Sequence, residues 1–195
     1  MQTSECLKEE FITTLISKTR SAEIKTEQDI YGRLLGNWKL KMIDYYPDGR
    51  TQRDHTGTWY FSRTLEGRAI QDVLVSPEFA DRSSGTSMVG NRYGNTFRMM
   101  DPKTCQWHID WFNPVTGIHN QLTARADGDR IVQESAETGG LMMRWIFENI
   151  TAESFHWYGE SSSDKGKTWI LNAEFFAERV KNEQNQFESR AEARL

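Results

Sequence analysis

The sequence predicts an all-β fold, an up-and-down antiparallel barrel of about ten strands that follows helical elements at the N-terminus. Gly36-Asn37-Trp38 opens a long series of short segments in which apolar and polar residues alternate. Tight glycine-containing turns separate these segments, so neighbouring segments are expected to pair as hairpins. A chain of 195 residues is long enough for one domain with a substantial core.

The first 34 residues are predicted to form a helical segment that packs on the barrel. A stripe of apolar residues at helical spacing predicts an amphipathic helix over about residues 4–18: Leu7, Phe11, Ile12, Leu15 and Ile16. Thr26-Glu27-Gln28-Asp29 has the pattern of a capping box. A second short helix or turn is therefore expected to lead into the barrel.

Residues 35–180 are predicted to form the barrel domain, and residues 181–195 a polar tail or short helix. The one long connection, from Ser76 to Gly85, is expected at the barrel mouth, where long loops often act as lids. The expected strands are 35–46, 54–64, 68–75, 88–100, 105–113, 118–126, 130–138, 141–150, 154–162 and 168–179.

Composition excludes several classes of partner. Lys and Arg number 24 against 28 Asp and Glu, and no basic block could follow a phosphate backbone, so no nucleic acid is expected. No stretch approaches the roughly 18 apolar residues of a membrane helix, and the N-terminus lacks the pattern of a secretory signal. We therefore expect a cytoplasmic protein without a membrane partner, in which Cys6 and Cys105 are reduced thiols.

Four sequence features together resemble a known group of proteins. They are Gly36-x-Trp38, the run from Gly67 to Val73, Arg144-Trp145-Ile146-Phe147, and the run from Asp164 to Trp169 with Glu174 and Arg179 after it. Over about residues 33–180 the chain resembles the lipocalin (calycin) superfamily, and within it a family of largely uncharacterised bacterial lipocalin-like domains. The resemblance implies a calycin barrel and a small-molecule site. Similar haem-binding barrels use a histidine late in the chain, which Thr168–Arg179 lacks, so no haem or other cofactor is expected.

Alternation along the strands predicts which residues face the lumen, since residues two apart share a side. The apolar side is taken as the inner side, and it contains Trp38, Leu40, Met42, Trp59, Phe61, Val73, Val75, Phe97, Met99, Trp107, Ile109, Trp111, Ile118, Leu122, Met143, Trp145, Phe147, Phe155, Trp157, Trp169, Leu171 and Phe175. This aromatic content exceeds what a small barrel needs to fill itself, so a cavity is expected.

The predicted function is the binding of a small, largely apolar, neutral molecule in that cavity. The aromatic side chains expected to hold it are Trp59, Phe61, Trp107, Trp111, Trp145 and Trp157. The polar side chains expected on the same faces are mostly neutral amides, which can bind a carbonyl or hydroxyl but provide no strong acid or base. Those expected to orient the ligand are Gln71, Asn91, Asn120 and Gln133, and Tyr93 is expected to contact it.

The sequence does not decide which face of strand 68–75 points into the lumen, and an alternative function depends on that choice. Ile70, Asp72 and Leu74 are nearly as well suited to the lumen as Gln71, Val73 and Val75. An inward Asp72 would need a cationic partner, either Arg144 or Arg98. The alternative is a cofactor-independent isomerase, lyase or cyclase that uses Asp72, Tyr93 and Arg144.

A second cluster has potential metal or acid–base chemistry. His108 and Asp110 lie on one expected strand and His119 on the next, where a regular hairpin would bring them together. Parity places all three on the barrel exterior, so solvated surface residues are the preferred interpretation and no metal is expected. A filled barrel acting as an interaction module is a third hypothesis. A homodimer is possible through an exposed face rich in Phe176, Phe112 and Tyr60.

Overall fold

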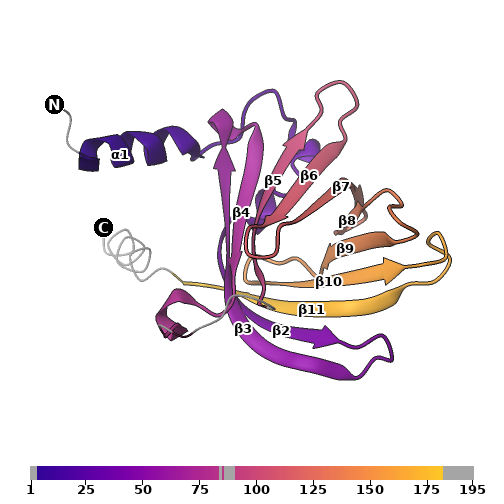
Figure 1. Cartoon of the computed structure of the whole chain (residues 1–195). Coiled ribbons are helices and arrows are strands. Elements are labelled where there is room, and N and C mark those ends of the chain that lie inside the picture. The colour runs from indigo at the N-terminus through magenta and orange to yellow at the C-terminus, as the bar shows by residue number, and fades with distance from the viewer. Residues whose placement is uncertain (1–3, 84, 86–90, 182–195) are drawn as a thin grey trace, which may run out of the picture.

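The computed structural model describes residues 4–83, 85 and 91–181, and these form a closed antiparallel β-barrel (Figure 1). Strand β3 pairs with both β2 and β4, and β2 also pairs with β11, so a ring of ten strands closes on itself. The strands of the ring are β2 (Gly36–Tyr45), β3 (Thr51–Thr64), β4 (Ala69–Val75), β5 (Tyr93–Met100), β6 (Trp107–Asn113), β7 (Ile118–Asp127), β8 (Arg130–Glu134), β9 (Met142–Glu148), β10 (Ser154–Ser162) and β11 (Ile170–Arg179). The predicted all-β barrel is confirmed.

The N-terminal segment contains helix α1 (Ser4–Leu15) and the two-residue strand β1 (Ile16–Ser17), which pairs with the end of β3. In Figure 1, α1 extends away from the barrel, and Phe11 and Ile12 are largely exposed. Two short 3-10 helices follow, η1 (Thr26–Gln28) and η2 (Gly32–Leu34), and two more lie later in the chain, η3 (Leu65–Gly67) and η4 (Phe79–Asp81). No helix in the described part of the chain is long and apolar enough to cross a membrane.

Two expectations extend beyond the described residues. The predicted tail, residues 181–195, lies outside them apart from its first residue. The beginning of the strand expected at 88–100 also lies outside, and β5 begins at Tyr93.

The N-terminal segment closes one end of the barrel with buried aromatic residues. Trp38 is fully buried, and its Nε1 donates a hydrogen bond to the Leu34 carbonyl at 2.7 Å. Tyr31 packs edge-on against Trp107, with ring centroids 5.1 Å apart. Trp107 Nε1 in turn donates to the Gln28 carbonyl at 2.9 Å. Because the indole N–H groups bond the segment's own backbone, its short helices are held over this end.

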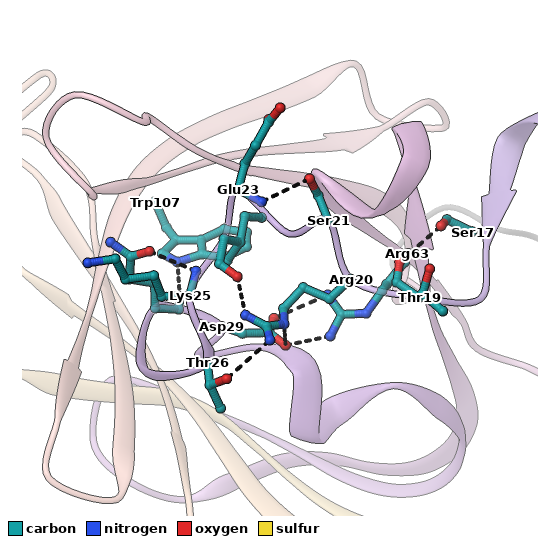
Figure 2. A network of polar contacts seen from close by, with 12 residues as sticks. Ser17, Thr19, Arg20, Ser21, Glu23, Lys25, Thr26, Asp29, Arg63 and Trp107 are labelled. Atoms are coloured by element: carbon teal, nitrogen blue, oxygen red, sulfur yellow. Dashed lines mark hydrogen bonds and ion pairs between the residues drawn. The ribbon is translucent and has the colours of Figure 1, made fainter.

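A charged network attaches the same segment to β3 (Figure 2). The Asp29 carboxylate accepts hydrogen bonds from the buried guanidinium of Arg63, one of them at 3.2 Å. Arg20 Nε lies 3.9 Å from the same carboxylate, and Arg20 Nη2 donates to Thr26 Oγ1 at 3.1 Å. Asp29 therefore lies between two cations and joins the segment before η2 to the barrel wall.

The Gly-x-Trp pattern has a physical cause in the contact with Arg179. Gly36 has a φ of +114°, and a Cβ atom there would lie 2.5 Å from Arg179 Nη1. The Arg179 guanidinium lies 4.0 Å from the centroid of the Trp38 ring and donates to the Leu35 carbonyl at 2.6 Å. A side chain at position 36 would be strained and would displace this cation.

The inward-facing residues of β4 are those of the alternative prediction, and the inward face of β5 is also opposite to the one predicted. Asp72 lies opposite Phe61 of β3, and opposite residues of an antiparallel pair share a face, so Ile70, Asp72 and Leu74 point inward. Thr96 lies opposite Asp72, which turns Phe97 and Met99 outward; Val73 is 39% and Met99 50% exposed. The inward prediction for Gln71, Val73, Val75, Phe97 and Met99 was therefore wrong.

A register shift changes the face of the first part of β11. It lies between Gly159 and Glu160 in the pairing of β10 with β11. Asn172 consequently lines the interior instead of Leu171, and Trp169 packs against Arg144, whose guanidinium lies 4.1 Å from the ring centroid. The inward prediction for Trp169 and Leu171 is corrected in the same way.

Replacement of Arg179 tests the closed end. Arg179→Met removes the stacking on Trp38 and the hydrogen bonds to backbone carbonyls, which together are expected to lower the free energy of unfolding by about 2 kcal/mol. Urea unfolding followed by tryptophan fluorescence measures the change. Arg125→Met, which removes an exposed surface ion pair, should change it by less than about 0.5 kcal/mol. Equal losses in the two variants would show that Arg179 has no special role.

Candidate ligand-binding site

A cavity of about 260 Å³ lies inside the barrel. One water molecule needs only about 10–15 Å³, so the cavity has room for a small organic molecule. Most of its walls are apolar: Trp59, Leu74, Trp111, Ile118, Met143, Trp145, Trp157, Gly159, Ala173 and Phe175. The polar residues of the lining are Arg92, Thr96, Arg98, Asn120, Glu160 and Asn172.

Tryptophan rings in contact with one another form one continuous wall. Trp145 contacts both Trp111 and Trp157, with ring centroids 6.0 and 6.2 Å apart. Trp157 stacks on Phe175 at 4.2 Å. Glycine makes room for the wall, since a Cβ at Gly94 would lie 2.5 Å from Trp111 Nε1. The ring therefore packs directly against the backbone of β5, and the lumen stays open beside it.

Asp72 is the central polar group of the interior. Its carboxylate accepts hydrogen bonds from Trp59 Nε1 at 2.7 Å and from Thr96 Oγ1 at 2.9 Å, and it pairs with Arg98 Nη1. The side chains of Asp72 and Arg98 are each only 1% exposed. Because three donors already occupy its oxygens, this carboxylate is better suited to fix the structure than to take a proton from a substrate.

Each charged residue of the cavity lining has a partner of opposite charge. Arg92 pairs with Asp44 at 2.5 Å, and Arg98 pairs with Asp72. Glu160 pairs with Arg144 at 2.7 Å. The formal charges at the cavity therefore cancel, which favours a neutral occupant over an ion.

A polar cluster adjoins the cavity at Arg92. Asp44 accepts from Arg92 and lies 3.2 Å from His55 Nε2, while His55 Nδ1 lies 3.0 Å from Ser76 Oγ. Burial acts to raise the pKa of Asp44, but the hydrogen bond to His55 and the charge and hydrogen bonds of Arg92 outweigh it, and the pKa falls to about 2. Ser76 is buried, and its hydroxyl donates to the Thr56 carbonyl at 2.7 Å. This serine, histidine and aspartate set therefore lacks an accessible nucleophile.

The structure places five of the eleven predicted ligand-contacting residues on the cavity wall: Trp59, Trp111, Asn120, Trp145 and Trp157. Phe61, Trp107 and Gln133 are buried in the barrel but do not line the cavity. Gln71 lies on the outer face and donates to Asn95 Oδ1 at 3.2 Å. Asn91 bonds Arg53, and Tyr93 lies near Arg82 on the same outer parity as Val75.

The three residues of the alternative enzyme hypothesis are not brought together. Asp72 faces the lumen and pairs with Arg98, the second of the two partners considered for it. Arg144 lies on the outer side of β9, between Glu160 and Trp169. Tyr93 faces outward from β5. This arrangement contradicts a catalytic group made of Asp72, Tyr93 and Arg144.

Several lining residues have no clear signal in the sequence. Thr96 and Arg98 were placed outside because Phe97 and Met99 carry the stronger apolar signal, and Asn172 was missed because of the register shift in β11. Arg92 precedes β5 in a loop, where alternation gives no information. For Arg98, the signal in the sequence is that an inward Asp72 needs a cationic partner.

The cluster of His108, Asp110 and His119, considered only as an alternative metal site, lies on the exterior as parity predicts. His119 Nε2 is 2.8 Å from Asp110 Oδ1, and the imidazole stacks on Phe112 at 4.5 Å. Asp110 also accepts from Gln121, and His108 extends from the same outer face of β6. Within residues 4–83, 85 and 91–181, no three His, Cys, Asp or Glu side chains form a group that could hold a metal.

Similarity to known proteins is confined to the fold. No protein-family model and no curated protein matches the chain. Among solved structures, it is similar to the S-type phycobiliprotein lyase CPES from Guillardia theta, with a TM-score of 0.51 and 10% identity over 83% of this chain and 97% of that one. A protein of unknown function from the DUF3598 family of Nostoc punctiforme aligns at 10% identity over 80% of this chain and 100% of the other, with a TM-score of 0.26. The likeness to the first of these structures concerns the barrel fold alone.

Acid titration tests the Asp44 cluster. A carboxylate whose folded pKa is about 2, against an ordinary 3.8, stabilises the fold above pH 4 and loses that effect as the pH falls toward 2. The wild type should therefore lose about 2 kcal/mol more unfolding free energy than Asp44→Asn between pH 5 and pH 2. Urea unfolding at each pH measures both proteins. Asp54→Asn, which removes an exposed carboxylate on β3, should follow the wild type, and an equally steep curve for Asp44→Asn would contradict the assignment.

Proposed function

We propose that the protein binds a small, largely apolar, neutral molecule inside the barrel. The observation that carries the proposal is the cavity of about 260 Å³, whose walls are mainly tryptophan and aliphatic side chains and whose charged residues are all paired. Apolar pockets with a few polar groups are the usual form of small-molecule sites. Asn120 and Asn172 provide neutral donors and acceptors on the wall.

A second candidate is an enzyme that acts on such a molecule in the same cavity. One similar solved structure is that of a phycobiliprotein lyase, and this activity belongs to that protein. In this chain the oxygens of Asp72 are already bonded, and Tyr93 and Arg144 face outward. Turnover would therefore need other groups, and binding is the preferred function. Location in the cytoplasm and assembly as a homodimer stay predictions.

Native mass spectrometry of the freshly purified protein, compared with its denatured mass, tests the proposal without assuming a ligand. A retained organic molecule supports binding and gives its mass. A retained metal ion would instead favour the exterior set of His108, Asp110 and His119. If the protein carries nothing, the dye titration below decides.

A neutral fluorescent probe, N-phenyl-1-naphthylamine, should bind the wild type saturably and quench its tryptophan fluorescence. At roughly 0.3 kcal/mol for each of about 17 non-hydrogen atoms, a dissociation constant of about 0.2 mM or tighter is expected. Ala173→Phe places a ring in the cavity, since Ala173 lines it and is buried. This variant should weaken probe binding at least tenfold.

Ala152→Phe is the matched control, because it adds the same side chain at an exposed position. It should bind the probe like the wild type. If the wild type shows no saturable signal, or if Ala173→Phe binds equally well, the cavity is not the binding site.

A further inference from the structure

Two hydrogen-bond donors inside the barrel have no partner among the described residues: Arg98 Nε and Gln133 Nε2. The Arg98 side chain is 1% exposed and Gln133 is fully buried. More than about 90% of buried polar groups in proteins are hydrogen-bonded, and leaving one unpaired costs about 1–3 kcal/mol. Both orphan groups are N–H donors, so the complementary group is a hydrogen-bond acceptor.

Of the two donors, Arg98 lines the cavity, whereas Gln133 is buried behind its wall. Arg98 lines the cavity, and its guanidinium lies 4.9 Å from the centroid of the Tyr31 ring, which belongs to the closed end. The Tyr31 hydroxyl donates to Gln133 Oε1 at 2.9 Å, which leaves the amide nitrogen of Gln133 as the unpaired end. Burial raises the pKa of Tyr31, so the hydroxyl stays a donor at neutral pH. Gln133 also pairs with Trp145 of the cavity wall in the β8–β9 register.

The charge of this inner end selects the kind of acceptor. Arg98 is already neutralised by Asp72, and both are removed from water. A ligand carboxylate would bring a second negative charge into this region with no free cation to balance it, which costs several kcal/mol. A carbonyl oxygen accepts the same hydrogen bonds without a counter-charge.

We propose that the ligand has an apolar body with a neutral carbonyl group at one end, and that this carbonyl accepts a hydrogen bond from Arg98 Nε. The aromatic wall of Trp111, Trp145 and Trp157 then packs on the apolar body. This inference rests on the proposed function, since it names the chemical class of the molecule that the cavity takes.

Matched small probes test the inference. Acetophenone has the carbonyl, isopropylbenzene has the same shape without an acceptor, and benzoate has a negative charge. Each is titrated against the protein loaded with N-phenyl-1-naphthylamine, and displacement of the dye gives its affinity. Acetophenone and isopropylbenzene should displace the dye from the wild type, and benzoate should be at least tenfold weaker than acetophenone.

The variant Arg98→Lys keeps the positive charge beside Asp72 but lacks the Nε donor. It should weaken acetophenone at least fivefold and leave isopropylbenzene within twofold. Arg125→Lys, a conservative change on the surface, should alter neither affinity.

A measurement on the unaltered protein covers the case in which a variant fails to fold. The infrared carbonyl stretch of bound, carbonyl-¹³C-labelled acetophenone should lie below its frequency in cyclohexane, because a hydrogen-bonded carbonyl is weakened. A frequency equal to that in cyclohexane overturns the inference. Equal weakening of both neutral probes in Arg98→Lys, or tighter binding of benzoate, also overturns it while leaving cavity binding intact. If neither neutral probe displaces the dye, the proposed function itself has failed.

Discussion

The buried ion pair between Asp72 and Arg98 is the interaction on which the rest of the interior depends. It joins β4 to β5, and the indole of Trp59 adds β3 through its hydrogen bond to the same carboxylate. A carboxylate in an apolar interior is tolerated only when its oxygens are bonded, and breaking such a pair typically costs about 3–5 kcal/mol. This requirement sets which face of two strands points inward. It also neutralises Arg98, the cation that lines the inner end of the cavity.

Two features of the barrel keep the cavity from being filled by side chains. Tyr31 and Leu34 of the N-terminal segment and Trp38 of β2 fill the closed end, so the aromatic side chains that line the cavity cannot pack into that space. Gly94 and Gly159 let Trp111 and Trp157 lie against the backbone. Much of the aromatic content of the barrel therefore lines a cavity. That use of tryptophan, together with paired charges, is the basis for a binding function selective for apolar, uncharged molecules.

Sequence alone predicted the barrel, its approximate strands and the aromatic wall, because period-two alternation and glycine turns are local signals. It failed where tertiary requirements overrode alternation. In β5 the inward residues are Gly94, Thr96 and Arg98, while apolar Met99 faces solvent, so the more apolar side was the outer one. The register shift after Gly159 depends on pairing across two strands. The unpaired nitrogen of Arg98 depends on the geometry of several elements and has no sequence signal.

A crystal structure determined under xenon pressure would show directly whether the barrel contains a stable apolar cavity. Xenon enters apolar cavities of this kind without needing any polar partner. We expect xenon density among Trp111, Trp145 and Trp157, with these rings unmoved and the pair of Asp72 and Arg98 intact. A barrel in which Met143 and the tryptophan rings fill the lumen, with no xenon between them, would contradict it.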